Sequence, residues 1–163
     1  MVNTKAIAGL LALSAMLAAC SGGSDGDADT SAQAEASAPA APEGPPAATD
    51  MSTLDGSTLA NFAGNAVNGK LVFAQCRTCH VTDAGVNKIG PSLNNIIGRT
   101  AGTVPGYTYS AANAGAGFVW TKEKLFQFLE KPQRVIPQTK MIYAGLPDAQ
   151  KRADLIAYLE TPN

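Results

Sequence analysis

The sequence predicts an all-α domain in which three to four short helices are joined by irregular loops. Apolar residues recur at helical spacing around 69–74, 121–132 and 147–159, and no segment shows the convincing apolar–polar alternation of a half-buried strand. Residues 81–117, in contrast, are rich in Gly, Asn, Thr and Pro. Loops of this length are uncommon in a compact domain. Short helices and long loops leave the domain short of core, so we expect a large apolar group to be bound inside it.

Each predicted helix has its own signals. The first covers residues 69–74 and leads directly into Cys76. Thr121 is a favoured N-cap for the second, and Pro132 ends it. The apolar face of this second helix consists of Leu125, Phe126, Phe128 and Leu129. The last helix begins near Pro147, because Pro fits the first turn of a helix. Its inward-facing residues are Leu155, Ile156, Tyr158 and Leu159.

Residues 1–19 have the pattern of an export signal. A weakly basic start is followed by an apolar run over 6–19, and fourteen helical residues span only about 21 Å. This is shorter than the ~30 Å hydrocarbon core of a bilayer, so a secretory signal is favoured over a spanning helix. The run ends in Leu-Ala-Ala-Cys at 17–20, which resembles the bacterial lipoprotein cleavage box and implies lipidation of Cys20. An ordinary signal peptide or an uncleaved anchor is the alternative.

Residues 20–60 are predicted to be a disordered tether. They contain Ala, Ser, Gly, Pro, Thr and acidic residues with almost no large apolar side chains, so they cannot offset the entropy of ordering. Residues 1–60 hold one Lys and seven acids, whereas 61–163 hold eleven basic residues and six acids, a net charge of +5. We therefore expect an acidic tether joined to a basic domain at 61–163. Such an asymmetry concerns partners rather than fold.

The segment 76–80, Cys-Arg-Thr-Cys-His, fits the C-x-x-C-H signature for covalent attachment of a c-type haem. The two thiols can reach the two vinyl groups at one porphyrin edge, and His80 then lies under the iron. A structural zinc site needs four ligands, but only Cys76, Cys79 and His80 lie in the domain. A thioredoxin-like site needs a βαβ unit, and a Cys76–Cys79 disulfide would leave the core empty. The pattern therefore favours haem.

A second axial ligand is expected if the haem carries electrons. His80 is the only His in the chain, so Met, Lys, Tyr or an open position remain. Of the four Met residues, only Met141 lies within the domain. A lone Met is more often core filler, but the absence of a rival ligand favours coordination here. His/Met ligation raises the haem potential and favours electron transfer over binding chemistry.

From Gly69 to Leu159 the chain resembles the class I cytochromes c of mitochondria and alphaproteobacteria. About 90 residues match in order, and the resemblance is carried by Gly90-Pro91-Ser92-Leu93, Gly98-Arg99, the run 105–110, Ala112-Asn113, Trp120, Ile136-Pro137, Thr139-Lys140-Met141 and the run 154–159. The resemblance implies the cytochrome c fold around one covalently bound haem c. It also implies an electron carrier and not an enzyme.

The resemblance assigns a role to each matching residue. Cys76 and Cys79 would hold the haem covalently, with His80 and Met141 as axial ligands to the iron. The Pro91 carbonyl would accept a hydrogen bond from His80. The haem propionates would be bonded by Arg99, Tyr109 and Trp120, and the residues expected in a buried polar network near Met141 are Asn113 and Thr139. Near the last helix, the residues expected to pack against Tyr158 are Gly69 and Phe73.

Two positions depart from the family pattern. Phe128 replaces a common Tyr whose hydroxyl reaches the Met sulfur, so the ligand bond or the potential is expected to differ. Gln138 replaces a common Gly before Thr-Lys-Met. If that position requires a positive φ, Gln is strained there and the ligand loop changes. Neither departure removes a ligand.

We expect the function to be single-electron transfer on the periplasmic side of a bacterial membrane. The carrier would be a lipid-anchored monomer, on the cytoplasmic rather than the outer membrane, and would not bind nucleic acid. Its electron would come from the quinol-oxidising bc complex and pass to a terminal cytochrome c oxidase. Acidic docking faces on these partners would meet a basic ring of Lys70, Arg77, Lys88, Lys131, Arg134 and Lys140.

Two alternatives remain open. The same domain could donate electrons to another periplasmic redox enzyme, such as a peroxidase, a denitrification reductase or a photosynthetic reaction centre. An open iron site would instead give a haem sensor or enzyme, which requires Met141 to be unbound.

Overall fold

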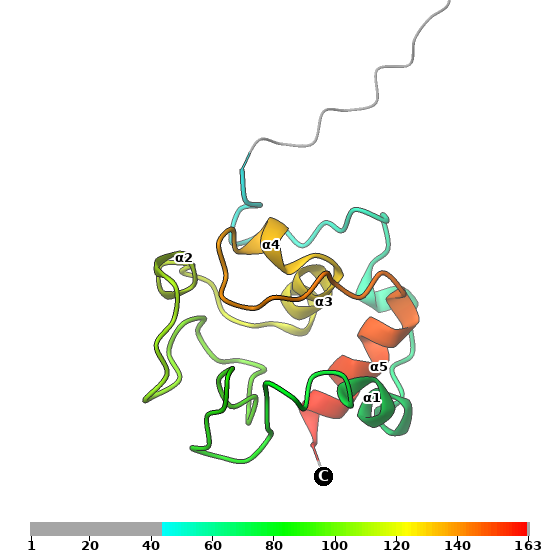
Figure 1. The fold of residues 1–163 in the computed structure, drawn as a ribbon. Coiled ribbons are helices and arrows are strands. Elements are labelled where there is room, and N and C mark those ends of the chain that lie inside the picture. Colours follow the sequence, from blue (N-terminus) through cyan, green and yellow to red (C-terminus); the bar gives the residue numbers. More distant parts are fainter. Residues whose placement is uncertain (1–43, 163) are drawn as a thin grey trace, which may run out of the picture. The chain divides into compact units, whose positions relative to one another are not determined.

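The computed structural model describes residues 44–162, and the predicted signal peptide, Cys20 and the first part of the predicted tether lie outside them. The helices are the 3-10 turn η1 (Leu59–Asn61), α1 (Ala66–Phe73), α2 (Ala111–Ala114), α3 (Lys122–Glu130), α4 (Pro132–Val135) and α5 (Ala149–Glu160). Between residues 44 and 162 the only β pairing is an isolated bridge from Thr100 to Val119. The all-α prediction is therefore confirmed (Figure 1).

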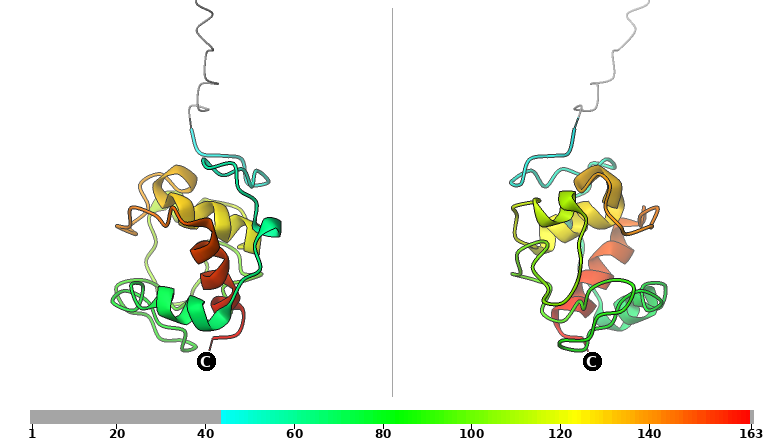
Figure 2. Two further views of the ribbon diagram at one scale, coloured as in Figure 1. Left: turned by 90° about the vertical axis from the view of Figure 1, so that its right-hand side faces the viewer. Right: turned by 60° about the vertical axis from the view of Figure 1, so that its left-hand side comes forward.

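The crossing of α1 and α5 is the closest helix contact in the domain (Figures 1 and 2). A Cβ on Gly69 would overlap the backbone carbonyl of Asp154 and lie 2.8 Å from the Tyr158 Cβ. Glycine therefore lets the two backbones approach, as the sequence predicts. The rings of Phe73 and Tyr158 pack beside it, with centroids 5.2 Å apart. α1 begins at Ala66 rather than 69, because the Asn65 side chain caps it.

α3 lies across the domain from α1 and contributes most of one wall of the core (Figure 1). The predicted cap is present, since Thr121 Oγ1 accepts a hydrogen bond from the Lys124 amide at 3.0 Å. Pro132 ends α3 as predicted and opens the short helix α4. α3 is more deeply covered than its amphipathic sequence suggests. Besides its apolar face, three polar side chains are buried: Lys124, Gln127 and Glu130.

The cover over this polar face is residues 47–57, here called the strap. Lys124 is 0% exposed, and its Nζ donates hydrogen bonds to the Ala47 and Asp50 carbonyls at 3.1 and 2.8 Å. Gln127 accepts from the same ammonium at 2.9 Å and donates to the Ser52 carbonyl at 2.9 Å. The first half of the strap is thus bound to α3 through its backbone carbonyls, which accept hydrogen bonds from Lys124 and Gln127.

The second half of the strap is held by hydrogen bonds to two charged side chains, Glu130 and Arg152. Glu130 accepts hydrogen bonds from the Leu54 and Asp55 amides at 2.7 and 3.0 Å. Arg152, on α5 and also 0% exposed, donates to Asp55 Oδ2 at 2.6 Å and to Ser57 Oγ at 2.8 Å. Hydrogen bonds to charged groups are stronger than neutral ones, at about 1.5–3 kcal/mol each.

Residues 47–57 of the predicted disordered tether, 20–60, are instead hydrogen-bonded to α3 and α5. Composition predicts disorder from a lack of apolar surface to bury, and this segment has little such surface. Ordering comes instead from hydrogen bonds between buried polar side chains of α3 and α5 and the strap backbone. None of the helices in residues 44–162 has both the length and the apolar character that a bilayer crossing requires.

We predict that the strap makes stability depend on acid through Asp55. Burial raises the pKa of Asp55, but hydrogen bonds from Ser57 and Arg152 outweigh burial and hold it below the ordinary 3.8. Since the folded pKa is the lower one, the contribution of Asp55 is present above about pH 4 and is lost as pH falls. Urea unfolding of the holoprotein between about pH 5 and 2 should show a shallower loss of stability for Asp55→Asn than for wild type.

The matched control is Asp83→Asn, because Asp83 is exposed on a loop. This variant should keep the wild-type pH dependence. Equal slopes for Asp55→Asn and wild type would contradict an ionised Asp55 in the strap.

Candidate haem-binding site

The turn that follows α1 places the two thiols and the imidazole. The Cys76 amide bonds the Phe73 carbonyl at 2.8 Å, and the Cys79 and His80 amides both bond the Cys76 carbonyl, at 3.1 and 2.9 Å. Helix-like turns therefore continue from α1 through the motif. Residues three and four apart share a face in such turns. All three functional side chains consequently line one cavity.

This cavity has a volume of about 290 Å³ and a mostly apolar wall. It is bounded by the turn after α1, the segments 89–96, 107–113 and 139–143, and one side each of α3 and α5. The apolar wall is formed by Phe73, Leu93, Ile96, Leu125, Phe128, Leu129, Leu155 and Leu159. The core deficit expected from the sequence is thus a cavity at the centre of the hydrophobic cluster.

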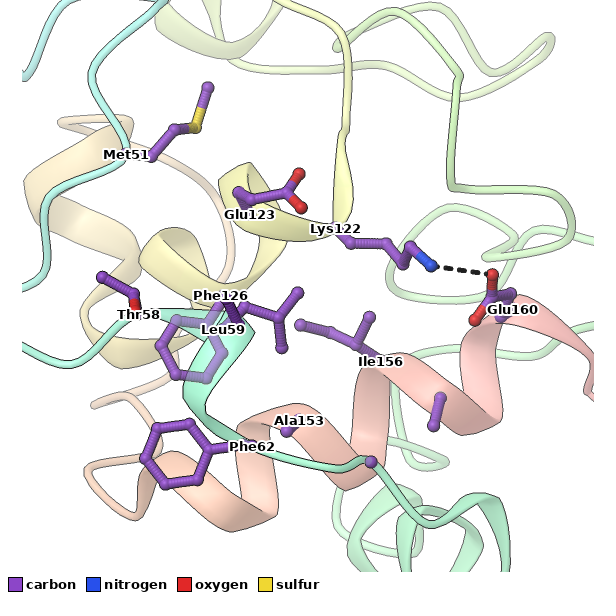
Figure 3. Close-up of a pocket in the computed structure, with 13 residues that line it drawn as sticks. Met51, Thr58, Leu59, Phe62, Lys122, Glu123, Phe126, Ala153, Ile156 and Glu160 are labelled. Carbon is purple, nitrogen blue, oxygen red and sulfur yellow. Dashed lines mark hydrogen bonds and ion pairs between the residues drawn. The ribbon is translucent and has the colours of Figure 1, made fainter.

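A second, more open hollow of about 450 Å³ lies beside η1, between α3 and α5 (Figure 3). Phe62, Phe126 and Ile156 form part of its lining, and an ion pair of 3.0 Å joins Lys122 to Glu160 at its edge. It has no thiol or imidazole in its wall. It therefore does not suit covalent attachment of a haem.

His80 is held in one tautomer. Its Nδ1 lies 2.8 Å from the Pro91 carbonyl oxygen, and because a carbonyl can only accept, Nδ1 carries the proton. The Nε2 lone pair is then available to a metal. Burial lowers the pKa of His80, although the Pro91 bond partly opposes this. A neutral imidazole is the form that coordinates iron, and the predicted contact with Pro91 is confirmed.

Gly90 is a positioning residue that the sequence analysis missed. A Cβ at this position would overlap the His80 ring and lie 2.7 Å from Nδ1 and 2.8 Å from Nε2. The ring therefore stacks on bare backbone, and the Gly90 amide bonds the Cys79 carbonyl at 2.8 Å. The available signal was the Gly that directly precedes Pro91.

The state of the thiols bears on the competing interpretations of the motif. Burial, together with the neighbouring Cys79, raises the pKa of Cys76 to about 11. Neither Cys76 nor Cys79 is in a disulfide. Within residues 44–162, no group of three His, Cys, Asp or Glu residues is arranged to hold a metal ion.

The loop from Ile136 to Pro147, here called the Met141 loop, brings Met141 to the same cavity. The Met141 amide bonds Thr139 Oγ1 at 3.3 Å, and Lys140 Nζ bonds the Thr108 carbonyl at 2.7 Å. Gln138 has φ 60°, which is the left-handed region that favours Gly. The strain expected for this departure is therefore present.

The other departure, Phe128, lies on the cavity wall. Its ring meets Trp120 edge to face, with centroids 4.8 Å apart. A phenyl ring offers no hydroxyl to the Met141 sulfur, so the hydrogen bond common in the family is absent from this pair.

Two polar residues on the cavity wall, Asn113 and Tyr109, have hydrogen-bonding atoms that the protein itself does not fully satisfy. A group bound in the cavity would complete their hydrogen bonds. Asn113 Oδ1 is buried on the cavity side and has no hydrogen-bond partner among residues 44–162. Buried polar atoms are rarely left unpaired. Tyr109 also lines the cavity, and its hydroxyl accepts only a long bond of 3.4 Å from the Val104 amide. Thr139 lines the cavity too, but no hydrogen bond joins it to Asn113 within these residues.

Arg99 and Trp120 do not line the cavity. Arg99 donates hydrogen bonds to the Asn94 and Ser92 carbonyls at 2.8 and 2.9 Å and braces that loop. Trp120 is buried between Phe118 and Phe128. Their roles toward haem propionates remain predictions.

The helical shell and its cavity define a class of protein. Two adjacent thiols and an oriented imidazole on the wall of an apolar cavity, with a thioether on the same cavity, form the ligand set of a c-type haem protein. The unpartnered Asn113 and the bare backbone under His80 fit such a group. When bound, haem supplies a one-electron couple.

Comparison with known proteins identifies the family. The model of the cytochrome c family matches residues 66–162, and the chain belongs to this family. It is 54% identical over 99 residues to cytochrome c 2.1 of Caenorhabditis elegans and to cytochrome c2 of Rhodopila globiformis. These alignments span 60% of this chain and 89% and 93% of those proteins. Cytochrome cH from Methylobacterium extorquens superposes with a TM-score of 0.57 at 38% identity, covering 60% of this chain and 99% of that structure.

Family membership establishes the general chemistry. Cytochromes c bind one covalent haem c and are electron carriers, not enzymes. The predicted fold, cofactor and class of activity are confirmed.

We predict that Gly90→Ala disturbs His80. The added methyl group overlaps the ring, so either the imidazole or the loop carrying Pro91 must shift. Overpacking of this kind costs about 1–3 kcal/mol. Urea unfolding of the holoprotein should show this loss, with a lower yield of covalently bound haem. Gly115→Ala, where the nearest atom is 3.3 Å from the added Cβ, is the control. Equal stability of the two variants would contradict the proposed close approach.

We predict that Gln138→Gly stabilises the protein. A non-Gly residue in the left-handed region costs about 1–2 kcal/mol, and the greater entropy of Gly in the unfolded chain removes part of the gain. The expected net gain is about 0.5–1 kcal/mol in urea unfolding. Asn95→Gly is the control, because Asn95 has φ 48° and Asn tolerates this region better. A loss of stability in Gln138→Gly would show that the side chain compensates for the strain.

Proposed function

We propose that this protein is a lipid-anchored periplasmic carrier that passes single electrons from the quinol-oxidising bc complex to a terminal cytochrome c oxidase. The observation that carries the proposal is the cavity wall, which brings both thiols, His80 and Met141 to one apolar space. In this proposal Cys76 and Cys79 bind the haem covalently. His80 and Met141 are the axial ligands of its iron.

This ligand set suits transfer rather than catalysis. His/Met coordination raises the potential of the iron, and filling both axial positions leaves no site for a substrate. The apolar wall excludes water and lowers the local dielectric, which raises the potential further. The Pro91 carbonyl fixes the tautomer of His80 and raises its basicity.

The mouth of the cavity has the composition of a docking surface. Ile142 and Ile89 line the cavity and are 100% and 73% exposed. Lys140 lies beside them, and Lys88 Nζ bonds the Arg77 carbonyl at 2.7 Å. An apolar centre with a charged rim is typical of protein interfaces.

Five of the six predicted ring residues are exposed, and the sixth, Arg134, is half-buried and donates a hydrogen bond to the Ser52 carbonyl. Within residues 44–162, none of the six predicted ring residues forms an ion pair with a carboxylate. The two basic side chains that are fully buried, Lys124 and Arg152, are bound by the strap and are not part of the ring. Basic side chains that are unpaired and exposed steer acidic partners over a distance set by salt.

Anchoring at Cys20 is the part of the proposal that rests on sequence. The apolar run over 6–19 and the Leu-Ala-Ala-Cys box support export and lipidation. A single acyl chain binds a membrane weakly, and two or three bind it stably. Since the proposed partners lie in the cytoplasmic membrane, we place the anchor there.

One experiment tests location and partner together. Wild type and Cys20→Ser are expressed in a bacterium with two membranes, and membrane and soluble fractions are stained for covalent haem. Wild type should be in the cytoplasmic membrane fraction and Cys20→Ser in the soluble one. The reduced soluble form should then be oxidised by oxidase-containing membranes, at a rate that falls as ionic strength rises.

A matched pair of variants tests the docking surface. Lys140→Gln should lower the oxidation rate at low salt, whereas Lys151→Gln should not, because Lys151 is paired with Asp148 on α5. An oxidation rate that does not fall as salt rises would contradict the role of the basic ring in docking. Oxidation by a peroxidase or a denitrification reductase, but not by oxidase membranes, assigns the carrier to a different partner.

A further inference from the structure

Two arginines connect to the two ends of the Met141 loop. Arg134 lies in α4, immediately before the loop begins. Arg152 lies in α5, after the loop ends, and its Nη1 donates hydrogen bonds to the Leu146 and Pro147 carbonyls at 2.9 and 3.0 Å. The Arg152 side chain is fully buried. It therefore fixes the loop's last residues from inside the protein.

The strap binds both arginines. Arg134 donates to the Ser52 carbonyl at 3.0 Å. The second terminal nitrogen of Arg152, Nη2, donates to Asp55 Oδ2 at 2.6 Å and Ser57 Oγ at 2.8 Å. One guanidinium thus holds the loop through Nη1 and the strap through Nη2. The ring of Phe126 lies 4.4 Å from its centre and limits where it can move.

The end of α3 makes a second connection. Both Glu130 oxygens accept strap amides, and the backbone beside it binds the loop, since the Leu146 amide donates to the Leu129 carbonyl at 2.7 Å. Gly145 passes so close that a Cβ there would overlap the Glu130 carbonyl. The end of α3 is therefore bound to the strap by the Glu130 side chain and to the loop by its backbone.

We propose that the strap is a positioning element for the Met141 loop: by holding Arg152 and Arg134, it keeps the loop closed over the cavity and sets how often Met141 leaves the iron. The proposal rests on the proposed role of Met141 as axial ligand. The strap, which precedes the family domain, would then have a function other than tethering, because it limits the access of external ligands to the haem.

The energetic reason lies in the burial of Arg152. If Asp55 and Ser57 lose their oxygens, Nη2 becomes an unpartnered donor on a buried charge, and Arg152 Nε already has no partner among residues 44–162. A charged group in that position costs far more than a neutral one. The guanidinium gains by turning toward water, and doing so breaks its bonds to Leu146 and Pro147. Loop closure should therefore weaken by about tenfold or more.

The test uses the full-length ferric holoprotein and the double variant Asp55→Ala/Ser57→Ala. Imidazole binds the iron only after Met141 has left, so its apparent affinity scales with the open fraction of the loop. We expect imidazole to bind about tenfold more tightly to the double variant, with a matching loss of the weak far-red absorption of the Met–iron bond. Amide hydrogen exchange at Leu146 and Tyr143 should accelerate by a similar factor.

Three control variants separate positioning from general loosening. Leu54→Ala changes a strap side chain that is 56% exposed, and Glu160→Gln removes the exposed ion pair with Lys122; both should behave as wild type. In Met141→Ala the iron is already open, so adding Asp55→Ala/Ser57→Ala should leave imidazole affinity unchanged.

Two results would overturn the proposal. One is unchanged imidazole affinity and unchanged loop exchange in the double variant. The other is equal acceleration of exchange at Gly69 and Tyr158, where α1 crosses α5, because this would mean only global destabilisation. If wild type itself lacks the far-red band, Met141 is not the ligand and the proposed function fails at that point. Exchange at Leu146 and Tyr143 then still decides whether the strap holds the loop.

Discussion

The crossing of α1 and α5 at Gly69 is the constraint on which the rest of the structure depends. Contact between the two backbones is possible only because this position has no side chain. The crossing fixes where α1 lies against α5, and the turns after α1 then bring Cys76 and His80 to the cavity. α5 in turn supplies the opposite wall. One missing Cβ thus sets the position of the haem attachment relative to the core.

The site itself is built from backbone as much as from side chains. His80 lies against the bare backbone of Gly90 and is oriented by the carbonyl of Pro91. The Met141 loop has little regular structure, and its one non-Gly residue with a positive φ, Gln138, is a type that does not favour that conformation. A loop held in this way needs support from its surroundings. Arg152 provides that support from α5.

The strap is stabilised by a different kind of interaction from the haem site. The haem site is maintained by apolar burial, whereas the strap is maintained by hydrogen bonds to buried charges on Lys124, Glu130 and Arg152. Each of these side chains would be costly to bury alone. The strap satisfies them, and its own backbone groups are satisfied in return. Residues 47–57, which precede the helical domain, are therefore part of the fold.

The sequence by itself determined the cofactor and the fold class, through local signals such as the spacing of two Cys and one His and the cap at Thr121. The orientation of His80 by the Pro91 carbonyl was implied by the family resemblance, and the role of Gly90 became visible only in the structure. Only the tertiary structure decided that residues 47–57 are ordered, that Arg99 braces a loop, and that Arg152 bonds both strap and Met141 loop. These contacts join positions up to 97 residues apart. A composition rule that counts apolar side chains cannot detect backbone carbonyls that meet a buried charge from the far end of the chain.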